Sequence, residues 1–139
     1  MNTACKFFSW ILLLMALNSC DTEKKVRPSN AMDTGRAFIR ASLDGDFGTA
    51  EELILKDSVN TEMFKSFKSF YQRMDEDLRK NYHNSSYEIN KFLEENDSIT
   101  IINYSNSYMQ KPMDIKVVRQ AGQWWVDFKY AYSGNLPIN

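Results

Sequence analysis

Residues 113–130 read MDIKVVRQAGQWWVDFKY, and this pattern predicts a β-hairpin. Its first part places an apolar side chain at every second position, which is the period of a strand with one buried face. The dipeptide Ala121-Gly122 supplies the turn. After the turn, apolar and aromatic side chains again occupy alternate positions: Trp124, Val126, Phe128 and Tyr130. The chain is therefore expected to end in an antiparallel sheet.

Two further strands are predicted before this hairpin. Residues 87–93 form the first, the acidic residues 94–97 form the turn, and residues 98–108, rich in Ile and Tyr, form the second. Pro112 interrupts the pattern before the hairpin begins. Four consecutive strands joined by short turns indicate an antiparallel meander.

The preceding half of the chain predicts three helices. Asp33 or Thr34 is placed to cap the first, and Gly45 to end it in the left-handed conformation. Asp46 can cap a second helix that runs to about residue 55. Over residues 60–82 large apolar side chains recur at intervals of three and four, so this segment predicts a single long helix. The expected fold is α+β, with three N-terminal helices packed on a curved antiparallel sheet of about four strands.

The N-terminus has the pattern of a bacterial lipoprotein signal peptide. Lys6 precedes an apolar run over residues 7–17, and Leu17-Asn18-Ser19-Cys20 resembles a lipobox. The run is too short to span a bilayer. The resemblance implies cleavage before Cys20 and its acylation, with diacylglyceryl on the thiol and a further acyl chain such as palmitate on the new N-terminus.

This pattern divides the chain into three parts: a signal peptide over residues 1–19, a lipidated cysteine and tether over residues 20–31, and a folded domain over residues 32–139. The tether is polar, mixed in charge and broken by Pro28, a composition that does not support a packed core. The expected localisation is the cell envelope, where Cys20 would anchor the domain to a membrane, either in the periplasm or at the surface.

The composition argues against several classes of protein. The chain has 17 basic and 18 acidic residues and a formal net charge of −1, so it lacks the basic excess typical of nucleic-acid binding. Both cysteines, Cys5 and Cys20, lie in the N-terminal segment, so the expected domain has no disulfide and no thiol nucleophile. With one histidine, it is not expected to hold a zinc site or a cofactor.

Two local motifs resemble a known family. These are the helix joint over residues 41–47, which contains Gly45-Asp46-Phe47, and the closing Gly122-x-Trp124-x-Val126 hairpin. Over residues 31–132 the chain resembles the NTF2-like, cystatin-like fold, and in particular small bacterial lipoproteins of the DUF4878 type. The resemblance implies a cone-shaped domain whose interior can enclose a cavity.

Enzymes of that fold place an ionisable group inside the cone, so polar and aromatic side chains are the candidates for a pocket. The candidate pocket residues are Tyr71, Tyr104, Tyr108, Trp124, Tyr130 and His83. None of them forms a recognisable catalytic pair, and Asp127 is expected to point away from the cone because it alternates with Trp124. We therefore expect a non-enzymatic domain that binds a small ligand or a protein partner. An NTF2-like enzyme and a purely structural envelope component are the alternatives.

Trp125 is the candidate interface residue. Strand alternation places Trp125 on the sheet face opposite Trp124, where an exposed aromatic often marks an interface. A homodimer through this face is expected, and Trp125→Ala should then weaken self-association in sedimentation velocity.

Ser58 and Ser98 each lie in an Asp-Ser-aliphatic triplet that resembles the O-glycosylation sites of some Gram-negative bacteria. An intact mass of the protein from its native host that shows no added sugar would contradict glycosylation at these serines.

Overall fold

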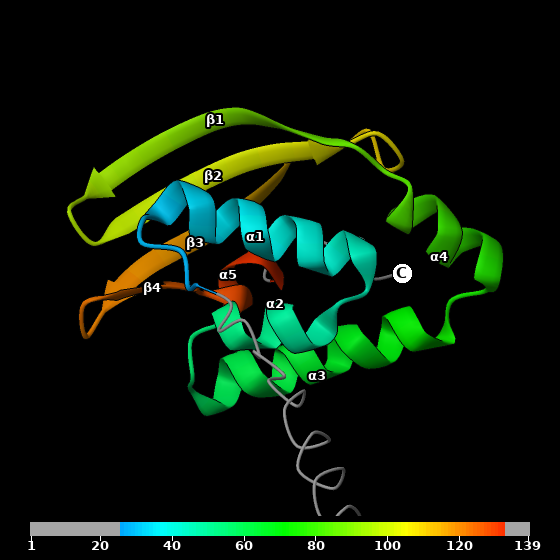
Figure 1. Ribbon diagram of the computed structural model, residues 1–139, viewed down its shortest axis with the longest axis horizontal. Coiled ribbons are helices and arrows are strands. Elements are labelled where there is room, and N and C mark those ends of the chain that lie inside the picture. The colour runs from blue at the N-terminus through cyan, green and yellow to red at the C-terminus, as the bar shows by residue number, and fades with distance from the viewer. Residues whose placement is uncertain (1–25, 133–139) are drawn as a thin grey trace, which may run out of the picture.

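The computed structural model describes residues 26–132, so the predicted signal peptide and Cys20 lie outside the described residues. Within this range helices come first and an antiparallel sheet follows (Figure 1). The elements in chain order are α1 (Ala31–Asp44), α2 (Phe47–Leu53), α3 (Ser58–Arg73), α4 (Glu76–His83), β1 (Tyr87–Asn96), β2 (Ile99–Asn106), β3 (Met113–Gln120), β4 (Gln123–Val126) and α5 (Phe128–Tyr132).

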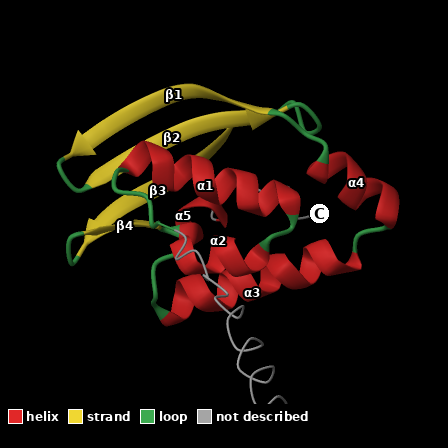
Figure 2. Ribbon diagram, viewed as in Figure 1, coloured by secondary structure: helices red, strands yellow, loops and turns green. Residues whose placement is uncertain are grey.

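The four strands form one open sheet in the order β1-β2-β3-β4, and every neighbouring pair is antiparallel. The helices lie together on one side of it (Figure 2). The register pairs Ile102 with Ile115 and Val117 with Val126, and all four side chains are buried. These observations confirm the predicted α+β class, with N-terminal helices packed against a four-stranded antiparallel sheet.

A glycine allows α1 to approach the sheet closely. A Cβ atom placed on Gly35 would lie 2.4 Å from Cδ1 of Ile102 and 3.3 Å from Cδ1 of Ile115. The absence of a side chain here therefore sets the distance between the helix and the centre of the sheet.

The helices meet around a cluster of phenylalanine rings. Phe64 of α3 is 1% exposed and lies among four other rings. The distances from the Phe64 centroid are 6.4 Å to Phe38, 6.1 Å to Phe47, 6.1 Å to Phe67 and 5.3 Å to Phe128. The rings come from α1, α2, α3 and α5, so this cluster joins the helical layer.

The two edges of the sheet differ. At β4, Ile54 forms a parallel bridge with Val126, and the Leu55 N–H donates to the Val126 carbonyl at 2.9 Å. At the other edge, most of β1 is exposed. Charged side chains on β1, such as Lys91 and Glu94, are typical of an edge strand that avoids pairing with other chains.

The joint between α1 and α2 follows the sequence prediction at Gly45 and Asp46. Gly45 ends α1 with φ of 72°, and the Asp46 carboxylate accepts from the Thr49 N–H at 3.1 Å. The start of α1 differs from the prediction, since the cap is Asn30 and not Asp33 or Thr34. The Asn30 side chain accepts from the Asp33 N–H at 2.8 Å.

The prediction of one long helix over residues 60–82 is wrong. α3 begins at Ser58 after the Asp57 cap and ends at Arg73, and a second helix, α4, begins at Glu76. The break occurs because the Asp75 carboxylate accepts from the Leu78 N–H at 2.8 Å and so caps a new helix.

Two predicted strand boundaries are also wrong. Residues 94–96, which were predicted to belong to the turn, continue β1. The turn is Asp97-Ser98, where the Asn96 side chain accepts from the Ser98 N–H at 2.9 Å. At the other end of the sheet, β4 stops at Val126. The chain then turns into α5, which inserts Phe128 into the core at 2% exposure.

None of the helices within residues 26–132 is long and apolar enough to cross a bilayer.

Candidate functional site

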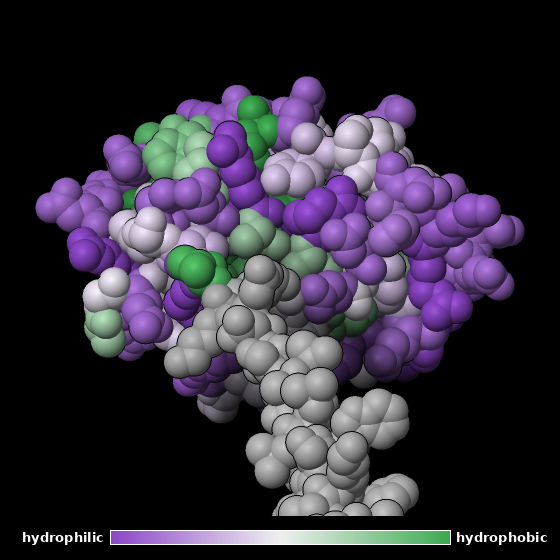
Figure 3. All heavy atoms as spheres, in the orientation of Figure 1, coloured by the Kyte–Doolittle hydropathy of each residue, from purple (hydrophilic) through white to green (hydrophobic). Residues whose placement is uncertain are grey.

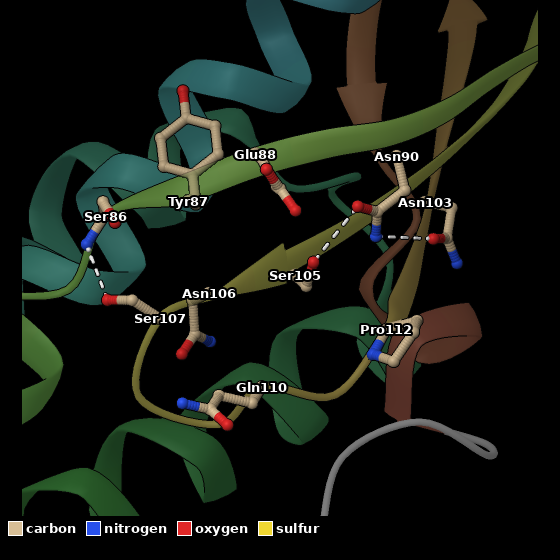
Figure 4. Close-up of a pocket in the computed structure, with 10 residues that line it drawn as sticks. All are labelled: Ser86, Tyr87, Glu88, Asn90, Asn103, Ser105, Asn106, Ser107, Gln110 and Pro112. Carbon is tan, nitrogen blue, oxygen red and sulfur yellow. Dashed lines mark hydrogen bonds between the residues drawn. The ribbon is translucent and has the colours of Figure 1, made fainter.

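A polar groove lies where the start of β1, the end of β2 and the loop over residues 107–112 meet (Figure 4). Its volume is about 560 Å³, within the range of small-molecule sites. The side chains that line it are Ser86, Tyr87, Glu88, Asn90, Asn103, Ser105, Asn106, Ser107, Gln110 and Pro112. We call this site the polar groove.

Strand alternation and one β-bulge build its floor. Asn103 and Ser105 alternate along β2 with Ile102, which faces the helices, so they occupy the opposite face of the sheet. The pairing of β1 with β2 shifts between Ile89 and Lys91, and Asn90 is the extra residue. Bulges re-aim side chains, and here Asn90 joins the polar face.

Hydrogen bonds connect these side chains. Nδ2 of Asn90 donates to Oδ1 of Asn103 at 3.0 Å, and Oγ of Ser105 donates to Oδ1 of Asn90 at 3.1 Å. Nδ2 of Asn103 donates in turn to Oδ1 of Asp114 at 2.5 Å. The amides are thus held in fixed orientations, as a pre-organised binding site requires.

Hydrogen bonds between Ser86 and Ser107 join the chain at one end of the groove. The Ser107 N–H donates to the Ser86 carbonyl at 2.9 Å, and the Ser86 N–H donates to Oγ of Ser107 at 3.2 Å. Gln110 and Pro112 lie across from Glu88, with β2 between them (Figure 4). Oδ1 of the buried Asn106 accepts from the N–H groups of residues 108 and 109, which shapes this loop.

Three of the predicted pocket tyrosines belong to one aromatic cluster between α3, α4 and β2. Tyr71 and Tyr82 lie 6.3 Å apart, and Tyr82 and Tyr108 lie 5.2 Å apart. Tyr104 lies near Tyr82, so an ionised Tyr82 would oppose ionisation of Tyr104. The hydroxyl of Tyr82 donates to the sulfur of Met109 at 3.2 Å.

Desolvation by burial raises the pKa of Tyr104, and the neighbouring Tyr82 adds to the shift. Burial likewise raises the pKa values of Tyr71 and Tyr82. A raised folded-state pKa means that these phenols stabilise the fold below their unfolded pKa of about 10, and that this contribution is lost as the pH rises further.

Alkaline titration should therefore show late-ionising tyrosines. In the folded protein, part of the tyrosinate absorbance near 295 nm should develop at higher pH than in the urea-unfolded chain, because burial opposes ionisation of Tyr71, Tyr82 and Tyr104. The unfolded chain is the internal control. Superimposable titration curves for the two states would contradict this prediction.

The other predicted pocket residues lie elsewhere. Trp124 packs against the core from β4, and Tyr130 lies on α5 and is 37% exposed. His83 is exposed at the end of α4, with Nδ1 at 3.5 Å from the Asp44 carboxylate. The six predicted pocket residues are thus not assembled into one site, and none lines the polar groove.

Trp125, the predicted interface residue, is half-buried and has the Arg27 guanidinium over its ring at 3.9 Å. Its role in self-association stays a prediction. Ser58 and Ser98 are exposed, the first at the start of α3 and the second in the turn between β1 and β2. Their glycosylation also stays a prediction.

Asp127, which strand alternation predicted to point away from the cone, is instead buried against α3. It is 7% exposed, and its Oδ1 accepts from Nδ2 of the fully buried Asn60 at 3.1 Å. The reason is the turn after β4, which ends the strand alternation on which the prediction relied. Among residues 26–132, His, Asp and Glu side chains form no group of three or more placed to hold a metal ion.

The sequence contained a signal for the polar groove that the prediction did not use. Along β2, Asn103 and Ser105 alternate with Ile102 and Tyr104, so the last part of this strand has one polar but uncharged face. The neighbouring segment over residues 84–86 reads Asn-Ser-Ser. The Asn90 bulge and the position of the loop after β2 required the three-dimensional structure.

No protein-family model and no curated protein matches the chain. Its fold defines it as an α+β protein with helices against one face of an open, four-stranded antiparallel sheet, and its candidate site is a polar groove on that sheet.

Proposed function

We propose that this chain is a lipoprotein of the cell envelope whose NTF2-like domain binds a small, uncharged, hydroxyl-rich ligand such as a saccharide. The polar groove carries the proposal. Eight of the ten side chains that line it bear an amide or a hydroxyl group, and one, Glu88, bears a charge. Amides and hydroxyls both donate and accept hydrogen bonds, which matches the mixed donors and acceptors of a sugar ring.

Electrostatics favours a neutral ligand over an anion. Glu88 is exposed in the lining, and Asp114 sits behind Asn103 at hydrogen-bond distance. An anionic ligand would meet both carboxylates, whereas a neutral polyol would not be repelled.

The membrane anchor and the family resemblance are each supported by observations other than the polar groove. The lipobox-like Leu17-Asn18-Ser19-Cys20 pattern supports anchoring through Cys20. The order of helices followed by antiparallel strands, together with the left-handed Gly45 and the Asp46 cap, supports the NTF2-like and DUF4878 resemblance.

The aromatic cluster supports a binding role over catalysis. An enzyme of this fold would use an inward group that changes protonation near neutral pH. The pKa of Tyr104 is shifted upward, so its hydroxyl stays protonated at neutral pH and acts as a donor, not as a general base.

Isothermal titration calorimetry of the full chain tests ligand binding. The ligands are three neutral disaccharides: cellobiose, maltose and N,N′-diacetylchitobiose. Asn90→Ala should weaken binding of the disaccharide that binds wild type by about tenfold, because it removes one polar contact worth about 1.4 kcal/mol. Asn81→Ala is the matched control, since Asn81 is also exposed but lies on α4. It should leave the affinity unchanged.

Equal affinities for the two variants would place the ligand outside the polar groove. Binding of glucuronate as tight as that of the neutral sugars would contradict the electrostatic argument. Folded protein that binds none of the sugars would favour the structural alternative.

A further inference from the structure

The segment just before α1 is attached to the last strand of the sheet by Arg27. Its Nη1 donates to the Glu52 carbonyl at 3.0 Å, and its Nη2 donates to the Trp124 carbonyl at 3.1 Å. The guanidinium carbon lies 3.9 Å from the centroid of the Trp125 ring. We call these three contacts the Arg27 clamp.

The chemistry of the clamp is specific to arginine. A planar guanidinium can donate to two carbonyls and stack on an aromatic ring at the same time, which a lysine ammonium cannot do. Stacking a cation on tryptophan adds attraction of about 0.5–1 kcal/mol at exposed sites and more where water is excluded. The clamp therefore fixes the point at which the N-terminal segment leaves the domain.

This exit point limits how far the domain can stand from an anchor at Cys20. Arg27 lies seven positions after Cys20, and a fully extended chain of this length spans at most about 25 Å. A compact domain of this size has a radius of gyration of about 13 Å, hence a diameter of about 34 Å. The tether is thus too short for the domain to turn its far side to the membrane while the clamp holds.

We propose that the surface around the Arg27 clamp faces the membrane. The proposal rests on the lipid anchoring described under Proposed function. This surface, the tether face, consists of Val26, Arg27, Pro28, Glu52, Lys56 and Trp125, which line a hollow of about 460 Å³. Its occupant is the headgroup layer of the bilayer that holds the acylated Cys20.

The chemistry of the tether face suits this occupant. Val26 is 92% exposed, and Lys56, which is also exposed, lines the same hollow as Trp125. Tryptophan is favoured at the boundary between lipid and water, and lysine and arginine are attracted to anionic headgroups. Elsewhere, the face visible in Figure 3 is largely hydrophilic over α4 and its surroundings.

The same orientation turns the polar groove away from the membrane. In Figure 1 the first described residues lie beside α2 and β4, whereas the loop over residues 107–112 lies at the far end of β2, beside the start of β1. A ligand from the aqueous envelope would then reach the groove without obstruction by lipid.

Two single-cysteine variants measure the orientation. Lys56→Cys lies on the tether face and Lys111→Cys on the loop beside the groove, and each replaces one exposed lysine. No cysteine follows Cys20 in the chain, so each new thiol is labelled selectively with a fluorophore. The full lipidated protein is reconstituted in vesicles of three parts phosphatidylethanolamine to one part phosphatidylglycerol that contain headgroup-nitroxide lipids. Quenching at residue 56 should exceed quenching at residue 111 by at least about twofold, given the short reach of the tether.

The clamp itself is tested by Arg27→Ala in both labelled proteins. Loss of the clamp lets residues 27–30 extend, which lengthens the reach to about 36 Å, similar to the domain diameter. The difference in quenching should fall by at least about half. Arg36→Ala is the matched control, since Arg36 is an exposed arginine of α1, and it should leave the difference unchanged.

The outcomes separate the orientation from the anchoring. Vesicle-bound, acylated protein with equal quenching at both labels, or with stronger quenching at residue 111, overturns the orientation and leaves the lipid anchor intact. Quenching at residue 56 that decreases as protein density rises would show a second copy covering Trp125, and also overturns it. Protein that carries no acyl mass and does not sediment with vesicles overturns the anchoring and, with it, the orientation.

Discussion

Phe64→Ala should destabilise the domain by about 3–5 kcal/mol, the usual cost of truncating a buried phenylalanine to alanine. Phe64 is 1% exposed, and its ring contacts phenylalanines from each of α1, α2 and α5. The substitution removes the apolar surface that joins these helices and leaves a cavity that a densely packed core cannot fill. Since small domains have a total stability of about 5–15 kcal/mol, a large fraction would be lost.

Urea denaturation followed by tryptophan fluorescence measures this change. The midpoint should fall sharply with little change in the slope, which would show altered stability and not an altered unfolded state. Phe70→Ala is the matched control, because Phe70 lies on the same helix but is 39% exposed. Similar losses for the two variants would contradict the central role given to Phe64.

The sequence predicted those parts of the fold that depend on local chemistry. The α1–α2 joint follows from Gly45, which tolerates positive φ, and from the capping carboxylate of Asp46. The alternation over residues 113–126 likewise predicted β3, β4 and their turn, because one-sided burial imposes a period of two.

The missed features depend on competition between local signals and packing. Apolar spacing continues through Met74 to Leu78 and Tyr82, so periodicity did not reveal the break that Asp75 makes. A separate α4 can then bring Tyr82 next to Tyr71. Similarly, Phe128 continued the strand pattern, yet burial among the other phenylalanines favours a helical turn at that point.

The candidate site was the least predictable part. Its floor follows from the alternation of Asn103 and Ser105 along β2, which the sequence contains. Its walls come from the Asn90 bulge and from the loop before Pro112, whose placement depends on contacts distant in sequence. Of the aromatic residues that looked most like a pocket, Tyr71, Tyr104 and Trp124 pack on the core, because large rings stabilise a small domain most when they are buried.

Asn60→Ala should destabilise the domain by about 2–4 kcal/mol, since it removes three hydrogen bonds of a buried amide, one of them to the buried Asp127 carboxylate. Asn60 is fully buried, and its Nδ2 donates to Asp57 at 2.8 Å and to Asp127 at 3.1 Å. Its Oδ1 accepts from the Lys129 N–H at 2.8 Å. One amide thereby joins the start of α3 to α5. Asn81→Ala, at an exposed position of α4, is the matched control and should change stability by less than about 0.5 kcal/mol.

The dependence of stability on pH distinguishes the hydrogen bonds of Asn60 from apolar packing. Hydrogen bonds from the backbone N–H of Asn60, and then from its side chain, lower the pKa of Asp57 below its ordinary value of 3.8. A lowered folded-state pKa stabilises the fold above about pH 4, and this contribution is lost as the pH falls through the acid range. Asn60→Ala removes the side-chain bond and keeps the backbone bond, so its urea midpoint should fall less than that of wild type between about pH 7 and pH 3. An equal acid-induced fall in both proteins would show that the Asn60 amide does not stabilise the Asp57 carboxylate.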